Sequence, residues 1–179
     1  MIVETPIGNL RFVAYADGEP LGATVATFRC GELEPILPLG MSVTRSVGVL
    51  VAVHPQVTMQ NFQVRALWAE EPPTNASPSS GERLDAQEWV GGGHIVVLGT
   101  EDGEALEDRL TEHGLLPDTY PVNNLPVGLE VTLPQVPAGF TTTLHFIVAI
   151  NTHPEPVDCS AWFAADVPHE RVQRVLGGS

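Results

Sequence analysis

The chain has 179 residues, 43% of them apolar, and its 22 acidic side chains against eight arginines give a formal net charge of -14. This composition argues against a disordered chain, and the acidic field argues against nucleic acids and anionic membrane surfaces as partners. Lysine is absent, for which a GC-rich coding genome is the simplest explanation.

The first 71 residues predict a unit of short antiparallel strands. Apolar and polar residues alternate along short runs, and Pro, Gly, Asn and Asp separate these runs, as in a β-sandwich or β-barrel. We expect about six strand segments, at residues 2–5, 10–15, 24–30, 33–38, 42–53 and 61–69.

Residues 72–90 predict a linker. The segment begins with Pro72-Pro73, continues with a Ser- and Pro-rich stretch and contains few apolar side chains before residue 84. It would separate the first β unit from a second unit at residues 91–168.

The second unit is expected to contain strands and one helix. Asp102 is a good N-cap for a helix near 103–113, and Gly114 is a good terminator for it. A short helix over 169–176 is expected in the C-terminal tail, residues 169–179. The strands of this unit are expected at residues 94–98, 127–133, 141–150 and 158–165.

A repeat links the two units. Leu33–Pro38 returns 96 positions later as Leu129–Pro134, and an alternating apolar run ending at His-Pro follows each copy. A second pair of runs, 62–68 and 157–163, extends the match with a small drift in offset. We therefore predict an all-β fold, an antiparallel β-sandwich of immunoglobulin-like or jelly-roll-like type, built from two related units with one short helix inserted in the second.

No catalytic signature is present, so we expect a protein that is not an enzyme, with no cofactor and no metal. The strand, turn and helix around residues 95–112 lack both a G-x-G-x-x-G segment and a Walker lysine, and we interpret Glu101 and its acidic neighbours as a helix first turn and a solvated face. His153-x-Glu155 with Asp158 and Cys159 has metal-binding residue types but is better interpreted as a solvated loop. Cys30 and Cys159 are expected to be small buried residues.

Four residues are candidates for an interaction surface: Trp162, Trp89, His54 and His153. Trp162 is the best of them, whereas Trp68 should belong to the core. The two histidines share a His-Pro context at strand ends, where a half-exposed position is common.

The leading functional hypothesis is a structural or assembly protein that acts through its surfaces, with a copy of itself or another subunit as partner. A bacteriophage virion component, such as a minor capsid, decoration or tail protein, is the best specific expectation. The alternative is a carbohydrate-binding or small-molecule-binding module with an aromatic site at Trp162 or Trp89. The N-terminus has no basic segment followed by an apolar stretch, so we expect no signal peptide and a cytoplasmic or virion location.

Overall fold

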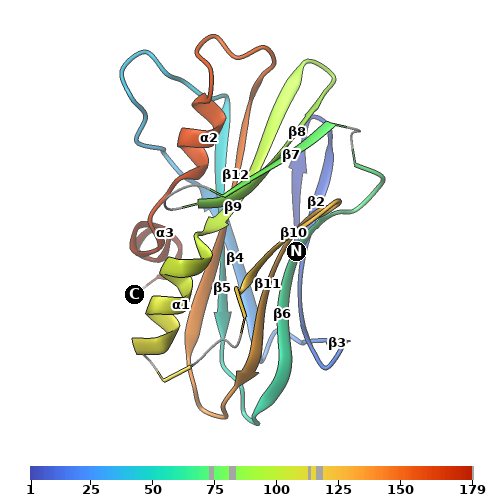
Figure 1. The fold of residues 1–179 in the computed structure, drawn as a ribbon, viewed down its shortest axis with the longest axis vertical. Coiled ribbons are helices and arrows are strands. Elements are labelled where there is room, and N and C mark those ends of the chain that lie inside the picture. Colours follow the sequence, from blue (N-terminus) through green and yellow to red (C-terminus); the bar gives the residue numbers. More distant parts are fainter. Residues whose placement is uncertain (73–74, 81–83, 113, 116–118, 179) are drawn as a thin grey trace.

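Two antiparallel sheets face each other in a β-sandwich (Figure 1). The computed structural model describes residues 1–72, 75–80, 84–112, 114–115 and 119–178, with residues 75–80 described by their backbone. The first sheet, sheet A, contains β1 (Ile2–Thr5), β2 (Gly8–Ala16), β6 (Met59–Trp68), β11 (Gly128–Val136) and β10 (Val122–Leu125) in that order, with β3 (Glu19–Pro20) on β2. The second, sheet B, has the order β4 (Ala26–Glu32), β5 (Arg45–Val53), β12 (Thr142–Thr152), β9 (His94–Glu101), β8 (Leu84–Gly91) and β7 (Asn75–Ser80).

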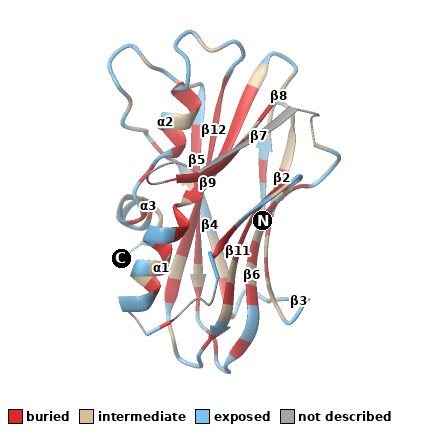
Figure 2. Ribbon diagram, viewed as in Figure 1, coloured by how far each residue is buried: buried red, intermediate tan, exposed pale blue. Residues whose placement is uncertain are grey.

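The main core lies between the sheets, where the alternating apolar residues of both meet (Figure 2). Phe12 of β2 contacts Phe146 of β12 edge to face, with ring centroids 5.6 Å apart. Trp68 and Trp89 form a second edge-to-face pair at 5.4 Å. Leu106 and Leu110 of helix α1 (Gly103–Glu112) belong to the same core. The helix comes directly after β9 in the chain and therefore packs as part of the sandwich.

A second, smaller core covers the outer face of sheet B. Helices α2 (Ser160–Ala165) and α3 (His169–Leu176) pack on this face and bury the residues of β9 and β12 that point away from the main core. The small side chains of Ala161, Ala164 and Ala165 allow α2 to approach sheet B closely. The contact is so close that a Cβ added at Gly99 of β9 would touch Ala165. Sheet B is therefore apolar on both faces, which explains its nearly continuous Val, Ile and Leu runs.

The predicted all-β sandwich is confirmed, together with the helix near 103–113, whose residue 113 lies outside the described part of the chain, and the C-terminal helix at 169–176. Asp102 caps α1 as expected, since its Oδ1 accepts hydrogen bonds from the backbone N–H groups of Glu104 and Ala105. Trp68 is buried, also as expected. Among the described residues, no helix is long and apolar enough to cross a membrane.

Three local predictions are wrong. Within the segment predicted as a linker, residues 75–80 and 84–90 form strands β7 and β8, while 73–74 and 81–83 lie outside the described residues. Residues 160–165 form a helix instead of a strand, because three alanines at helical spacing bury one helix face. Cys30 and Cys159 are exposed, on an edge strand and at the start of α2.

The internal duplication stays a prediction. The two segments at the centre of the match are β5 and β12, which lie side by side in sheet B with Val49 opposite Phe146. The flanking segments differ, since 129–134 is strand whereas 33–38 is loop, and 62–68 is strand whereas 160–163 is helix. Both halves contribute strands to both sheets, so they form one sandwich.

A buried carboxylate on β8 ties the start of α1 to sheet B. Asp85 of β8 is 1% exposed, and its Oδ2 accepts hydrogen bonds from the Tyr120 hydroxyl at 2.6 Å and from the Gly103 N–H at 2.9 Å. Burial raises the pKa of Asp85, against the effect of these two donors. Burial also raises the pKa of Tyr120, so its hydroxyl stays a donor at neutral pH. Gly103 is required here, because a Cβ at this position would overlap the Tyr120 ring.

We expect Asp85→Asn to lower the free energy of unfolding by about 1–3 kcal/mol, because a neutral amide oxygen is a weaker acceptor than the carboxylate for the Tyr120 hydroxyl and the Gly103 N–H. Urea denaturation measures this. Asp108→Asn, on the exposed face of α1, is the control and should change stability by less than about 0.5 kcal/mol. Equal effects of the two substitutions would contradict the role of Asp85.

Candidate functional site

Two histidines and a glutamate come together on the outer face of sheet B. In the β12–β9 register Phe146 lies opposite Thr100, so the preceding residue His145 lies next to Glu101 on the face that α3 covers. His169, the first residue of α3, completes the group from above. One side-chain atom of each residue, a ring nitrogen or a carboxylate oxygen, lies within 4.8 Å of the others.

The two imidazoles form a hydrogen-bonded chain. Nδ1 of His145 lies 2.9 Å from Nδ1 of His169, and Nε2 of His169 lies 2.9 Å from the Thr143 hydroxyl oxygen. A backbone hydrogen bond with Val167 raises the pKa of His145, against the effect of burial. In a neutral histidine pair one ring donates the shared proton and the other accepts it. When His169 is the donor, its Nε2 accepts a hydrogen bond from the Thr143 hydroxyl.

Glu101 is held by a bidentate ion pair. Arg109 of α1 donates to Oε2 from its terminal nitrogen at 2.7 Å and to Oε1 from Nε at 3.1 Å. The same terminal nitrogen also donates to the Thr143 carbonyl at 3.0 Å. Oε2 lies 4.0 Å from Nδ1 of His169. The prediction that Glu101 belongs to a solvated face is therefore wrong, because this carboxylate is largely buried and points toward the histidines.

Both histidines are neutral at physiological pH. Complete burial, followed by the nearby His169 and Arg109, lowers the pKa of His145 to about 3. Burial and Arg109 lower the pKa of His169 to about 4, although Glu101 and Glu170 act in the opposite direction. Neutral imidazoles offer electron pairs to a proton or a metal ion, which imidazolium groups do not.

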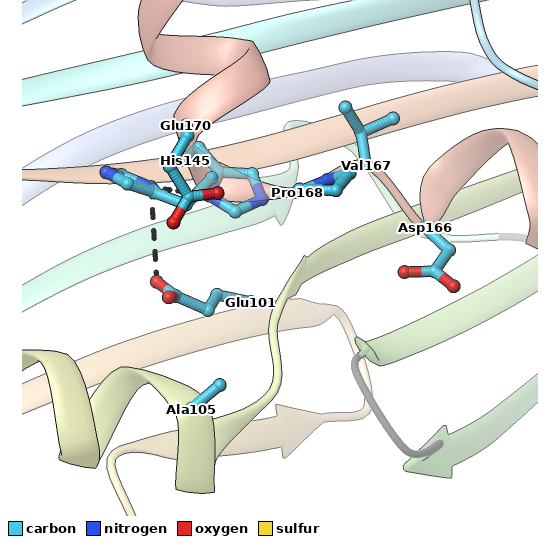
Figure 3. A pocket seen from close by; sticks show the side chains of 8 residues that line it. Glu101, Ala105, His145, Asp166, Val167, Pro168 and Glu170 are labelled. Carbon is cyan, nitrogen blue, oxygen red and sulfur yellow. Dashed lines mark hydrogen bonds and ion pairs between the residues drawn. The ribbon is translucent and has the colours of Figure 1, made fainter.

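The cluster lies at a pocket of about 360 Å³ between α1, α3 and the α2–α3 connection (Figure 3). Glu101 points toward the imidazoles, whereas Asp166 lies to one side of them (Figure 3). A smaller hollow of about 210 Å³ shares His169 and Glu170 with it and extends toward Thr143 and Gln173. The lining of the larger pocket is Glu101, Ala105, His145, Asp166, Val167, Pro168, His169 and Glu170.

This lining contains side chains that can bind a metal ion or accept a proton, but no Ser, Thr, Cys or Lys nucleophile. The two imidazole nitrogens and the carboxylate match the side chains that bind Zn²⁺ and similar ions in proteins. Three acidic side chains also make the pocket attractive to cations.

The structure does not bring the four predicted surface residues together. Trp89 has no exposed surface, so its assignment to an interaction surface is wrong: β8 lies inside sheet B and directs this indole into the main core. Trp162 is half-buried on α2 and donates from Nε1 to Glu88 at 2.5 Å. His54 and His153 are exposed at opposite ends of the sandwich.

The His153–Cys159 segment does not form a metal-binding cluster with its neighbours in the described structure. Glu155 Oε1 instead accepts hydrogen bonds from the Asn151 side chain and from the Ala161 N–H, both at 2.8 Å, and so holds the start of α2. Residues 153–159 form a loop in the described structure.

The Glu101–His145–His169 cluster has no local sequence pattern, because it joins a strand end, a strand interior and a helix start that are far apart in the chain. One sequence signal was present: the strand that buries Leu144 and Phe146 on one face carries His145 beside Ile147 and Ala149 on the other. A polar residue on an apolar strand face needs a partner, and that partner is His169.

The chain matches no protein-family model, no curated protein and no solved structure. The candidate sites therefore depend on the geometry of this chain alone.

Proposed function

We propose that the protein is a non-enzymatic interaction protein that binds another subunit of an assembly through one end of the sandwich. The observation that carries this proposal is a pair of apolar side chains on the 33–44 loop: Ile36 is 80% exposed and Leu39 is 106% exposed. Scattered exposed apolar residues are common, but a group of them on an ordered, acidic surface indicates a contact site.

The loop is anchored, so its exposed side chains have a defined place. Leu33, Leu37 and Val43 pack on the outer core of sheet B, and Arg171 of α3 donates to the Glu34 carbonyl. Asn151 donates to the Ser42 carbonyl at 2.9 Å and also to Glu155, which links this loop to the 153–159 loop. The two loops lie at the same end of the molecule, beside α2 (Figure 1).

We call this end the apolar tip and define it by Ile36, Leu39, Val157 and Phe163, which are all exposed. The predicted interaction residue His153 lies on the same 153–159 loop. The two loops contain Glu34, Glu155 and Asp158 but no Arg or Lys.

This charge pattern favours a partner whose surface combines an apolar patch with basic side chains. It disfavours a second copy of the chain, because two acidic tips would repel each other. The setting we propose is a bacteriophage particle, with the protein as a minor capsid, decoration or tail component. The composition supports this setting, through the absence of lysine and the coding genome that it implies.

We expect Leu39→Glu to abolish a complex of fixed stoichiometry with the partner subunit when the two are produced together in the native host. The charge would face the apolar patch of the partner without compensation. Affinity purification followed by light scattering measures the stoichiometry, and Val57→Glu, an exposed change in the β5–β6 loop, is the control. A complex that tolerates Leu39→Glu, or a concentration-dependent homodimer through the tip, would contradict the proposal.

The alternative, a small-molecule-binding module, is favoured by one observation, the pocket beside α3. Its lining has no aromatic residue other than the two histidines, so the pocket does not provide the stacking platform expected for a sugar. A thermal-shift screen of polar and cationic compounds tests this alternative, because a specific ligand would raise the melting temperature.

A further inference from the structure

We propose that Glu101, His145 and His169 form a binding site for a divalent transition-metal ion such as Zn²⁺, at the base of the pocket beside α3. The proposal goes beyond the role of the apolar tip and does not depend on it. It is based on the residue types, their spacing, the groups that hold them and the pocket that gives access to them.

The spacing of the two imidazoles suits coordination to one ion. Two nitrogens at the usual zinc distance, with bond angles between right-angled and tetrahedral, lie about 2.9–3.4 Å apart. The Nδ1 atoms of His145 and His169 are 2.9 Å apart. Oε2 of Glu101 lies 4.0 Å from the second of these nitrogens, so a small side-chain rotation brings it to the same ion.

The protons of the site can rearrange to free both nitrogens. In one tautomer of the neutral pair, Nδ1 of His145 carries an electron pair and Nδ1 of His169 carries a proton. When an ion binds both nitrogens, the His169 proton moves to Nε2, where the Thr143 hydroxyl lies 2.9 Å away. A hydroxyl can accept as well as donate, so Thr143 reverses its role and the imidazole pair neither gains nor loses a proton.

Each of the three ligands has an outer partner that fixes its orientation. The Val167 backbone hydrogen-bonds to the His145 ring, the Thr143 hydroxyl oxygen lies 2.9 Å from Nε2 of His169, and Arg109 donates to Glu101. Outer partners of this kind orient the ligands of metal sites and select the ring tautomer. A carboxylate has about four electron-pair positions, so Glu101 can bind Arg109 and an ion together.

The surroundings favour a cation despite Arg109. Glu101 neutralises the guanidinium, and Asp166 and Glu170 add negative charge to the pocket lining. The pocket of about 360 Å³ gives an ion a route to the histidines and has room for water or another ligand.

The test is a titration of the full chain with Co²⁺ at neutral pH in a buffer without chelators. We expect one ion per chain, visible absorption bands of a cobalt site with nitrogen ligands, and loss of these bands when Zn²⁺ is added. His169→Gln and Glu101→Gln should each weaken binding about tenfold or more. His54→Gln is the matched control, because it removes an exposed histidine that is not part of the cluster and should leave the affinity unchanged.

Circular dichroism shows whether each variant is folded. If His169→Gln is not, the histidine NMR signals of the unaltered protein decide: Zn²⁺ should shift the His145 and His169 ring signals, and His54 should not respond. Binding no tighter than that of the exposed histidines would overturn the proposal, as would tight binding that survives Glu101→Gln and leaves the His145 and His169 signals unchanged.

Discussion

Acidification from pH 6.5 to about 4 is expected to lower the free energy of unfolding of the metal-free protein by about 6 kcal/mol through two buried histidines. Unfolding returns each histidine to an ordinary pKa of 6.5, whereas in the folded protein the pKa of His145 is about 3 and that of His169 about 4. The unfolded state therefore binds more protons below pH 6.5. Their stabilising contribution is complete above this pH and is lost as the pH falls.

The groups around the histidines do not cancel this effect. Arg109 opposes protonation of both rings, while Glu101 and Glu170 favour protonation of His169 without restoring its ordinary pKa. Each histidine contributes about 1.4 kcal/mol per pH unit in the steep region. Domains of this size are typically stable by about 5–15 kcal/mol, so the predicted loss is enough to unfold a protein of average stability.

Urea denaturation at a series of pH values, with a chelator present, measures this loss. His169→Gln should remove about half of the slope between pH 6.5 and 5. Asp85 has the opposite effect on stability. Burial raises its pKa in the folded state, so on acidification this carboxylate binds a proton in the folded protein before it does so in the unfolded protein. A free energy of unfolding that does not change between pH 6.5 and 5 would contradict the prediction.

Trp89→Ala is expected to destabilise the protein by about 3–5 kcal/mol. The indole is completely buried and packs edge to face on Trp68 at 5.4 Å, so truncation leaves a large cavity between the sheets. Thermal and urea unfolding, monitored by far-ultraviolet circular dichroism, measure the loss.

Two further variants separate packing from other effects. Trp89→Phe should cost less than Trp89→Ala, because it keeps an aromatic ring and removes an indole N–H that has no hydrogen-bond partner within the described structure. Phe163→Ala, at the exposed apolar tip, should change stability by less than about 0.5 kcal/mol. A loss with Trp89→Ala as small as that with Phe163→Ala would place the indole outside the core.

The class of fold follows from local patterns in the sequence. Strands β2, β5, β6 and β12 alternate apolar and polar residues or form short apolar runs between turn residues, and α1 has a recognisable cap in Asp102. Such signals depend only on neighbouring residues, so the sequence reveals them without knowledge of the tertiary structure.

Strand β8 and helix α2 were harder to predict, because their residues are explained by distant contacts. In the sequence, Asp85 is typical of a loop. Its place in a buried strand is explained only by the hydrogen bonds that it accepts from Gly103 and Tyr120. At the start of α2 and in the loop before it, Val157, Cys159, Ala161 and Phe163 alternate as in a strand, and only the approach of the alanine face to Gly99 selects the helix.

The candidate site was missed for a related reason. His145 and His169 are 24 residues apart, on a strand and at a helix start, and each has an unremarkable local context. His54 and His153 share a repeated His-Pro dipeptide, whereas the structure brings together two histidines that share no motif.

The place of β12 in sheet B has a consequence for synthesis on the ribosome. This strand pairs with β5 on one side and β9 on the other, and β11 likewise pairs with β6 of the first half. Until β12 has emerged, β5 and β9 each lack their inner neighbour and leave unpaired backbone groups beside apolar side chains. We therefore expect the nascent chain to be prone to aggregation at this stage, and the sandwich to close only once β12 has inserted.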